Sequence, residues 1–172
     1  MINNLLFDFT VDKTTNTVFI TREFAAEISL VWDAFTKPEI LDQWGAPKPW
    51  ITQTISMDFI VGGRRFYKMI SPEGQEYFSV QDFTSISPKT NFKYISGLSD
   101  KDQNINPGFY GAENNLDFSE AIGPDSYRVT TFRMAIKYKE LATLEMMAND
   151  RFKEGFTMTL NILEELLESQ IQ

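Results

Sequence analysis

A long amphipathic stripe near the C-terminal end of the chain constrains the fold more than any other feature. Apolar residues recur there every three or four positions, at Leu144, Ala148, Phe152, Phe156, Leu160, Leu163 and Leu167. The spacing predicts one helix of roughly 26 residues, about 39 Å long. Because one broad face of this helix is apolar, it must lie against something of similar length, and the strands upstream are the candidate.

The middle of the chain predicts a succession of strands. Strand-like runs, with Pro- or Gly-containing turns between several of them, cover 51–57, 64–70, 77–86, 91–96, 115–122 and 127–137. Residues 97–113 are rich in Asn, Asp and Gly, and here we expect a long loop, either simply solvated or acting as a lid.

The N-terminal part predicts a hairpin followed by two short helices. Residues 7–12 alternate between apolar and polar, and 18–22 continue the strand pattern after a polar turn. An apolar stripe over 26–35 predicts the first helix. The sequence Thr-Lys-Pro-Glu at 36–39 predicts a capping box that begins the second helix, which ends near Trp44.

Together these elements predict an α+β chain with the helix-grip fold. In that fold a curved antiparallel β-sheet wraps around a long C-terminal α-helix, and two short helices follow the first strand. A chain of 172 residues fits one domain with a sizeable core. We therefore expect a single domain over 1–172, in which 1–15 form an N-terminal extension or an extra strand.

The composition disfavours several classes of function. The chain has no Cys and no His, which removes thiolate and imidazole chemistry and the usual zinc and copper ligand sets, so we expect no metal and no cofactor. A net charge of −8 disfavours nucleic acids and anionic membrane surfaces. No apolar run approaches the ~18 residues that span a bilayer, and no basic stretch precedes the short N-terminal apolar run. We expect a cytoplasmic protein without membrane insertion.

Several motifs resemble one known family. They are Arg22-Glu23-Phe24, the run from Val31 to Thr36, Pro38-Glu39 with Trp44, Met57-Asp58 with Gly62-Gly63-Arg64, the strand from Tyr77 to Pro88, and Glu154-Gly155-Phe156. They resemble domains similar to the C-terminal part of the activator of the heat-shock protein 90 ATPase, within the START-like (SRPBCC) superfamily of birch-pollen-allergen-like proteins. The resemblance covers roughly residues 16–168 and implies the helix-grip fold.

The resemblance also implies a choice of functions. The superfamily includes carriers of lipids, sterols and hormones, partner-binding domains, and polyketide cyclases and aromatases. We expect a small apolar or amphipathic ligand between the last helix and the sheet. The alternatives are a co-chaperone-like domain that stimulates a heat-shock chaperone ATPase, and a pocket enzyme of the cyclase or hydrolase type. No catalytic residue is assigned, because the carboxylates are scattered and no base is placed to activate a Ser or Thr.

Aromatic residues supply most of the candidate pocket wall. They make up 14% of the chain, with 15 Phe, and such side chains line a pocket as readily as they fill one. The expected wall residues are Trp44, Arg65, Tyr67, Met69, Phe83, Phe132, Met134, Phe152 and Phe156. Trp44 is either a core residue or part of the pocket rim. Gly155 marks either a close approach of helix and sheet or room for a ligand.

Arg65 is the most informative of these residues. Strand alternation places Arg65, Tyr67 and Met69 on one face, and the family tends to have an inward-facing aromatic residue at the position of Arg65. A buried guanidinium needs an anion or several acceptors. Three outcomes are open: a ligand carboxylate or phosphate, an internal ion pair, or an exposed side chain.

Overall fold

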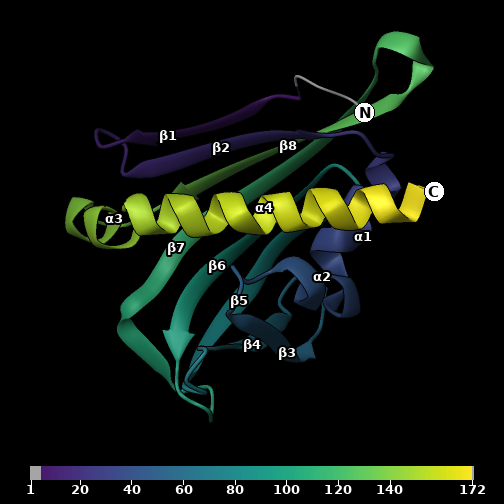
Figure 1. Ribbon diagram of the computed structural model, residues 1–172. Helices are drawn as coiled ribbons and strands as arrows, with labels where there is room; N and C mark the ends of the chain where they lie inside the picture. The colour runs from purple at the N-terminus through teal and green to yellow at the C-terminus, as the bar shows by residue number, and fades with distance from the viewer. Residues whose placement is uncertain (1–4, 172) are drawn as a thin grey trace.

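One curved antiparallel sheet forms most of the protein, as the computed structural model of residues 5–171 shows (Figure 1). Its strands are β1 (Phe7–Asp12), β2 (Thr17–Phe24), β3 (Ile51–Met57), β4 (Arg64–Ile70), β5 (Glu76–Ser87), β6 (Asn91–Ser99), β7 (Ile105–Ile122) and β8 (Arg128–Lys137). They lie in the order β1-β2-β8-β7-β6-β5-β4-β3. The sheet is therefore a meander from β3 to β8, to which the N-terminal hairpin adds through the pairing of β2 with β8.

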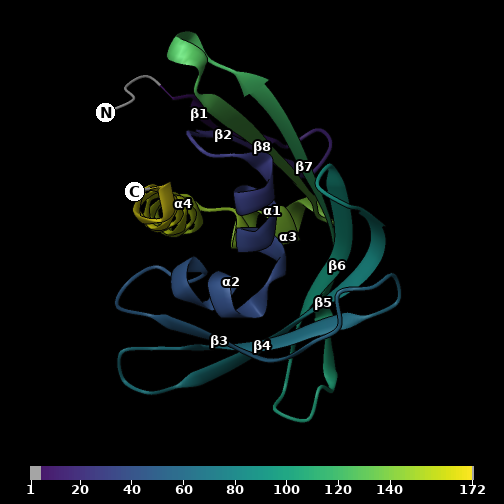
Figure 2. The same ribbon diagram turned by 90° about the vertical axis from the view of Figure 1, so that its right-hand side faces the viewer.

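The α-helices of the described residues lie on the concave face of this sheet (Figure 2). They are α1 (Ile28–Thr36), α2 (Pro38–Trp44), α3 (Leu141–Met147) and α4 (Asp150–Ile171), and a short 3-10 turn, η1 (Pro124–Ser126), joins β7 to β8. Figure 2 looks along α4 and shows the sheet curving around it, with α1 and α2 beside it. This arrangement confirms the α+β helix-grip fold. None of the helices formed by residues 5–171 combines the length and the apolar character needed to cross a bilayer.

The long C-terminal helix predicted from the stripe is confirmed as α4, but it has 22 residues instead of roughly 26, because the first part of the stripe belongs to α3. Ala148 ends α3, and the side-chain oxygen of Asn149 accepts a hydrogen bond from the backbone N–H of Phe152 at 3.0 Å. Asn is a preferred residue at a helix N-cap, so Asn149 begins a new helix instead of continuing the old one. The break escapes a periodicity analysis because apolar residues continue through it at helical spacing.

The long loop predicted over 97–113 was also wrong. β6 extends to Ser99 and β7 begins at Ile105, so the turn between them covers only residues 100–104. The Asp100 carboxylate closes this turn by accepting hydrogen bonds from the backbone N–H groups of Asp102 and Asn104, each at 2.9 Å. The pairing is irregular at Gly97, where an added Cβ would lie 2.5 Å from the ring of Tyr110. Gly97, which contributed to the prediction of a loop, thus permits a bulge between paired strands.

The capping box predicted at the start of α2 does not form. Thr36 is the last residue of α1, and its hydroxyl donates to the carbonyl of Trp32 at 2.8 Å, so it is not free to cap α2. The N-cap of α2 is Lys37, without a side-chain capping bond, and Pro38 occupies the first turn as predicted.

Aromatic side chains fill one half of the space inside the curved sheet. Phe35 stacks on Phe132 with ring centroids 4.5 Å apart, and Trp32 meets Phe118 edge-on at 5.2 Å. Along α4 the packing changes in character. Leu160 and Leu163 are fully buried, whereas Phe152 and Phe156 are only partly buried. The C-terminal half of α4 is therefore held in the core, and its N-terminal half leaves space above the sheet.

Candidate ligand-binding pocket

A pocket of about 750 Å³ lies beneath the N-terminal half of α4. Its floor comes from the inward-facing side chains of β4 to β8, and its roof from α4 and the end of α3. The segments 45–47, after α2, and 107–112, in β7, contribute further lining residues. Pockets that hold small molecules typically measure about 300–1,000 Å³, so this volume suits a small molecule.

Strand register explains which side chains meet in the floor. Alternate residues of a strand point to one face, and the pairing of neighbouring strands aligns those faces. Arg65 pairs with Gln81, Gln81 with Ser96, and Ser96 with Ala112. Tyr94 lies opposite Asn114 in the next row. The polar residues of the floor therefore come from four consecutive strands, β4 to β7.

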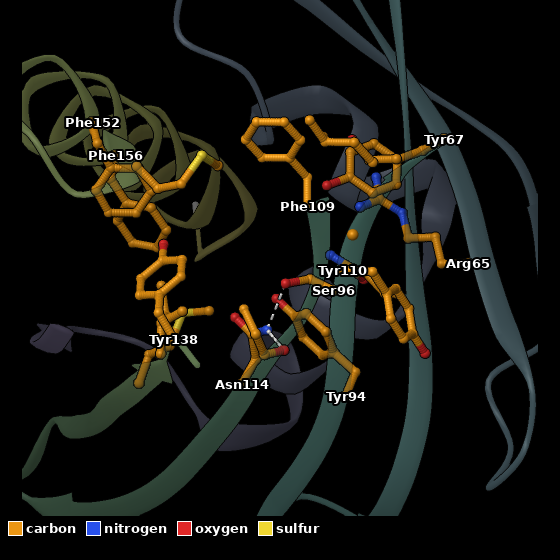
Figure 3. A pocket seen from close by; sticks show the side chains of 18 of the residues that line it. Arg65, Tyr67, Tyr94, Ser96, Phe109, Tyr110, Asn114, Tyr138, Phe152 and Phe156 are labelled. Carbon is orange, nitrogen blue, oxygen red and sulfur yellow. Dashed lines mark hydrogen bonds between the residues drawn. The ribbon is translucent and has the colours of Figure 1, made fainter. Parts of the chain in front are cut away.

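The wall opposite this polar floor is largely apolar, although Arg151 and Thr159 of α4 also line the pocket. Phe152 and Phe156, one turn apart on α4, have ring centroids 5.7 Å apart and both line the pocket. Met134 and Ile136 of β8 and Met147 of α3 continue the apolar surface. Figure 3 shows Phe152 and Phe156 on one side of the pocket and Arg65 and Tyr67 on the other. A molecule that satisfies both sides has an apolar body and a polar end.

Arg65 is buried in the floor, with only 3% of its surface exposed. Its Nε donates to the hydroxyl of Thr54 at 3.0 Å, and its Nη2 lies 3.4 Å from a carboxylate oxygen of Asp42. The guanidinium also lies 3.9 Å from the ring centre of Tyr67. Of the three outcomes left open by the sequence, the structure shows the internal ion pair, in a side chain that also lines the pocket. Burial lowers the pKa of Arg65, and the neighbouring negative charge opposes that shift.

Two tyrosine hydroxyls also face the pocket. Tyr94 and Tyr138 are buried and line the pocket, and neither hydroxyl forms a hydrogen bond with residues 5–171. Every fully buried polar side-chain atom of the described residues has a partner, so these two hydroxyls must reach the pocket surface. Burial raises the pKa of Tyr138 to about 12 and raises the pKa of Tyr94 as well. Both are therefore protonated at neutral pH and available as hydrogen-bond donors.

The buried tyrosines predict a loss of stability in alkaline solution. Tyr138 titrates near 10 when unfolded and near 12 when folded, so between these values only the folded chain keeps the proton and stability falls as pH rises. A pKa difference of this size is worth up to about 2–3 kcal/mol, of which about half is lost by pH 11. Urea unfolding at pH 8 and pH 11 should show this fall, and a smaller fall in Tyr138→Phe. The exposed Tyr77 provides the control, and an equal fall in Tyr77→Phe and Tyr138→Phe would contradict the assignment.

Seven of the nine expected wall residues line this pocket. They are Trp44, Arg65, Tyr67, Met69, Met134, Phe152 and Phe156. Trp44 is at the same time a core residue, since it is buried and its indole N–H donates to the carbonyl of Ala34 at 2.9 Å. Gly155 lines the pocket too, and an added Cβ would make ordinary contact with Pro47 at 3.6 Å and none with the sheet.

Phe83 and Phe132 were expected at the pocket wall but lie outside it. Phe83 packs edge-on against Phe59 at 4.9 Å, and Phe132 is fully buried beneath Phe35. Both point to the concave face of the sheet, as alternation predicts. They lie at the end of that face which α1 covers, where aromatic side chains fill the interior.

Sequence reasoning overlooked several polar lining residues. Tyr94, Ser96 and Asn114 all line the pocket, and the Asn114 amide donates to the Ser96 hydroxyl at 2.9 Å. Alternation along 91–96 places Tyr94 and Ser96 on one face, so this signal was present in the strand pattern. Tyr138 follows Met134 and Ile136 at the same spacing, one residue past the end of β8. Phe109 was hidden by the prediction of a loop over 97–113.

The pocket lacks the arrangements that usually carry catalysis. Glu140 is the one carboxylate among the described lining residues, so no pair of carboxylates is available for acid–base chemistry. Across residues 5–171 no group of three His, Cys, Asp or Glu side chains converges as metal ligands do. The chemistry that the site offers is apolar contact and hydrogen bonding.

Comparison with known proteins identifies a matching family and solved structures with a similar fold. A family model described as Activator of Hsp90 ATPase homolog 1-like protein matches residues 25–168. Protein Ms6760 from Mycobacterium smegmatis is 24% identical, with 97% of this chain and 99% of that chain covered and a TM-score of 0.81. A protein from Arthrobacter aurescens is 19% identical, with 94% and 91% covered and a TM-score of 0.83.

A third solved structure carries the family's name. It is the AHSA1 protein SPO3351 from Silicibacter pomeroyi, which is 20% identical over 90% of this chain and 99% of that chain, with a TM-score of 0.65. At these identities the likeness supports the fold alone. No curated protein gives a significant match to the sequence.

Proposed function

Since the chain belongs to the family of activator of Hsp90 ATPase homolog 1-like proteins and has the START-like fold, we propose that it binds a small amphipathic molecule in the pocket beneath α4. The observation that carries the proposal is a pocket of about 750 Å³ with an apolar wall on α4 and β8 and hydrogen-bonding groups in its floor. Burial of an apolar ligand surface contributes roughly 25 cal/mol for each Å² removed from water, so the wall formed by Phe152 and Phe156 supplies the affinity.

A neutral fluorescent probe tests this proposal without knowledge of the natural ligand. Phenylnaphthylamine is nearly non-fluorescent in water and bright in apolar surroundings. Titration into the protein should give a saturable rise in fluorescence with one probe bound per chain, and native mass spectrometry should show the same stoichiometry. The unfolding temperature should increase with probe concentration, because a ligand of the folded state stabilises it. Unsaturable fluorescence together with an unchanged unfolding temperature would contradict a pocket ligand.

Family membership also favours a second candidate, a co-chaperone-like domain that binds a heat-shock chaperone. The net charge of −8 would help select a basic surface on such a partner. Co-purification with the chaperone, and a change in its ATPase rate that weakens with added salt, would support this candidate. It would also require a shared compartment, and the cytoplasmic location stays a prediction. We propose no reaction, because no pair of carboxylates lines the pocket among the described residues.

A further inference from the structure

Arg65 has hydrogen-bonding capacity that the protein does not use. A guanidinium carries five N–H donors, and the described residues supply acceptors at two of its nitrogens: Thr54 at Nε and Asp42 at Nη2. Nη1 forms no hydrogen bond with residues 5–171, since the bonds of Arg65 run from Nε and Nη2. Because every fully buried polar side-chain atom in that range has a partner, Nη1 must reach the surface of the pocket that Arg65 lines.

The guanidinium is held rigidly, as a binding group needs to be. Asp42 is itself fixed by two hydrogen bonds from Thr54, one from the backbone N–H at 2.8 Å and one from the hydroxyl at 2.7 Å. Tyr67 packs against the guanidinium at 3.9 Å from its ring centre. The donors that face the pocket are therefore oriented before any ligand arrives, which lowers the entropy cost of binding.

Tyr94 places a second donor on the same side of the pocket. Its hydroxyl forms no hydrogen bond with the described residues, and Tyr94 lines the same pocket as Arg65, from β6, two strands away in the sheet. In Figure 3 Arg65, Tyr67 and Tyr94 lie apart from Phe152 and Phe156, which face them from α4. Arg65 and Tyr94 thus lie across the pocket from the two phenylalanines of α4 (Figure 3).

We propose that the pocket selects a monocarboxylate with an apolar body. Its carboxylate accepts hydrogen bonds from Arg65 and Tyr94, and its apolar part lies against Phe152 and Phe156. A single negative charge suits the site because Asp42 already pairs with Arg65, so a phosphate dianion would meet repulsion from that carboxylate. This inference rests on the proposed function and names the chemical class of the ligand.

Matched ligands separate this inference from the proposed function. Decanoate and decanol share the apolar chain and differ in the polar end, and isothermal titration calorimetry compares their affinities. The wild-type protein should bind decanoate at least tenfold more tightly than decanol, the scale of one charge-assisted hydrogen bond. Decyl phosphate, as the dianion at pH 8.5, should bind more weakly than decanoate. Equal binding of decanoate and decanol would overturn the monocarboxylate proposal and leave the apolar pocket standing. Failure of decanol and phenylnaphthylamine to bind would overturn the pocket function itself.

Two variants assign the preference to the named residues. Arg65→Met keeps most of the apolar stem of the side chain without its charge, and should lower the ratio of decanoate affinity to decanol affinity at least tenfold. Tyr94→Phe should weaken decanoate binding severalfold and decanol binding little. Circular dichroism and urea unfolding check that each variant is folded. If Arg65→Met does not fold, the test of the monocarboxylate proposal rests on Tyr94→Phe and on the ligand series with the wild-type protein. A full preference for decanoate in a folded Arg65→Met protein would overturn the assignment.

Discussion

Leu160→Ala is expected to lower the free energy of unfolding by about 3 kcal/mol, and Phe156→Ala, one turn earlier on α4, by half as much or less. Leu160 is fully buried, so its truncation leaves a closed cavity in the half of α4 that the core holds. Phe156 is partly buried and already lines the pocket, so its truncation enlarges a space that solvent reaches. Urea unfolding followed by circular dichroism measures both changes.

An exposed residue of the same helix supplies the control for this comparison. Met158 has 42% of its surface exposed, and Met158→Ala should change the unfolding free energy by less than about 0.5 kcal/mol. The order of the three variants is the decisive result. Equal losses for Phe156→Ala and Leu160→Ala would mean that the N-terminal half of α4 is packed as tightly as the rest, and that the space beneath it is not a pocket.

Local sequence patterns were sufficient to predict β3 and β4, because turn residues mark where these strands begin and end. The bounds of β3 and β4 match the prediction residue for residue, because Gly62 and the turn at 71–74, each with a glycine of positive φ, mark where β4 begins and ends. The extended ends of β6 and β7 could not be predicted in this way. Their residues pair with each other across a turn, and the pairing is irregular at Gly97. The Asn, Asp and Gly residues of this segment hide the apolar–polar alternation that identifies a strand.

The pocket shows a similar division between local and tertiary information. Alternation predicted that Arg65, Tyr67 and Met69 share one face, and they line the pocket on the concave face that also carries Phe83 and Phe132. The end of that face that aromatic side chains fill is the end that α1 covers. The position of α1 is a tertiary feature that the alternation of a strand does not reveal. The partner of Arg65 is likewise tertiary: Asp42 lies on α2, 23 residues earlier, and comes within reach only because α2 packs against β3.

Ala112→Trp is expected to abolish binding of any pocket ligand, with affinity reduced at least about 100-fold. Ala112 lines the pocket on β7, opposite Ser96 of β6. A strand side chain points away from the sheet and cannot turn to the other face, so an indole at this position must occupy the pocket. Tryptophan is also well tolerated in strands, so the variant should fold. Titration with phenylnaphthylamine measures the loss.

The neighbouring residue gives a matched control for this last prediction. Glu113 is exposed and does not line the pocket, so Glu113→Trp adds the same side chain to the convex face of the same strand. Probe affinity should stay within about twofold of the wild type in that variant, and both variants should unfold at similar urea concentrations. A ligand that still binds to Ala112→Trp, or that is lost equally from both variants, does not occupy the space beneath α4. The binding function would then have to be sought on the outer surface, where the co-chaperone-like candidate places it.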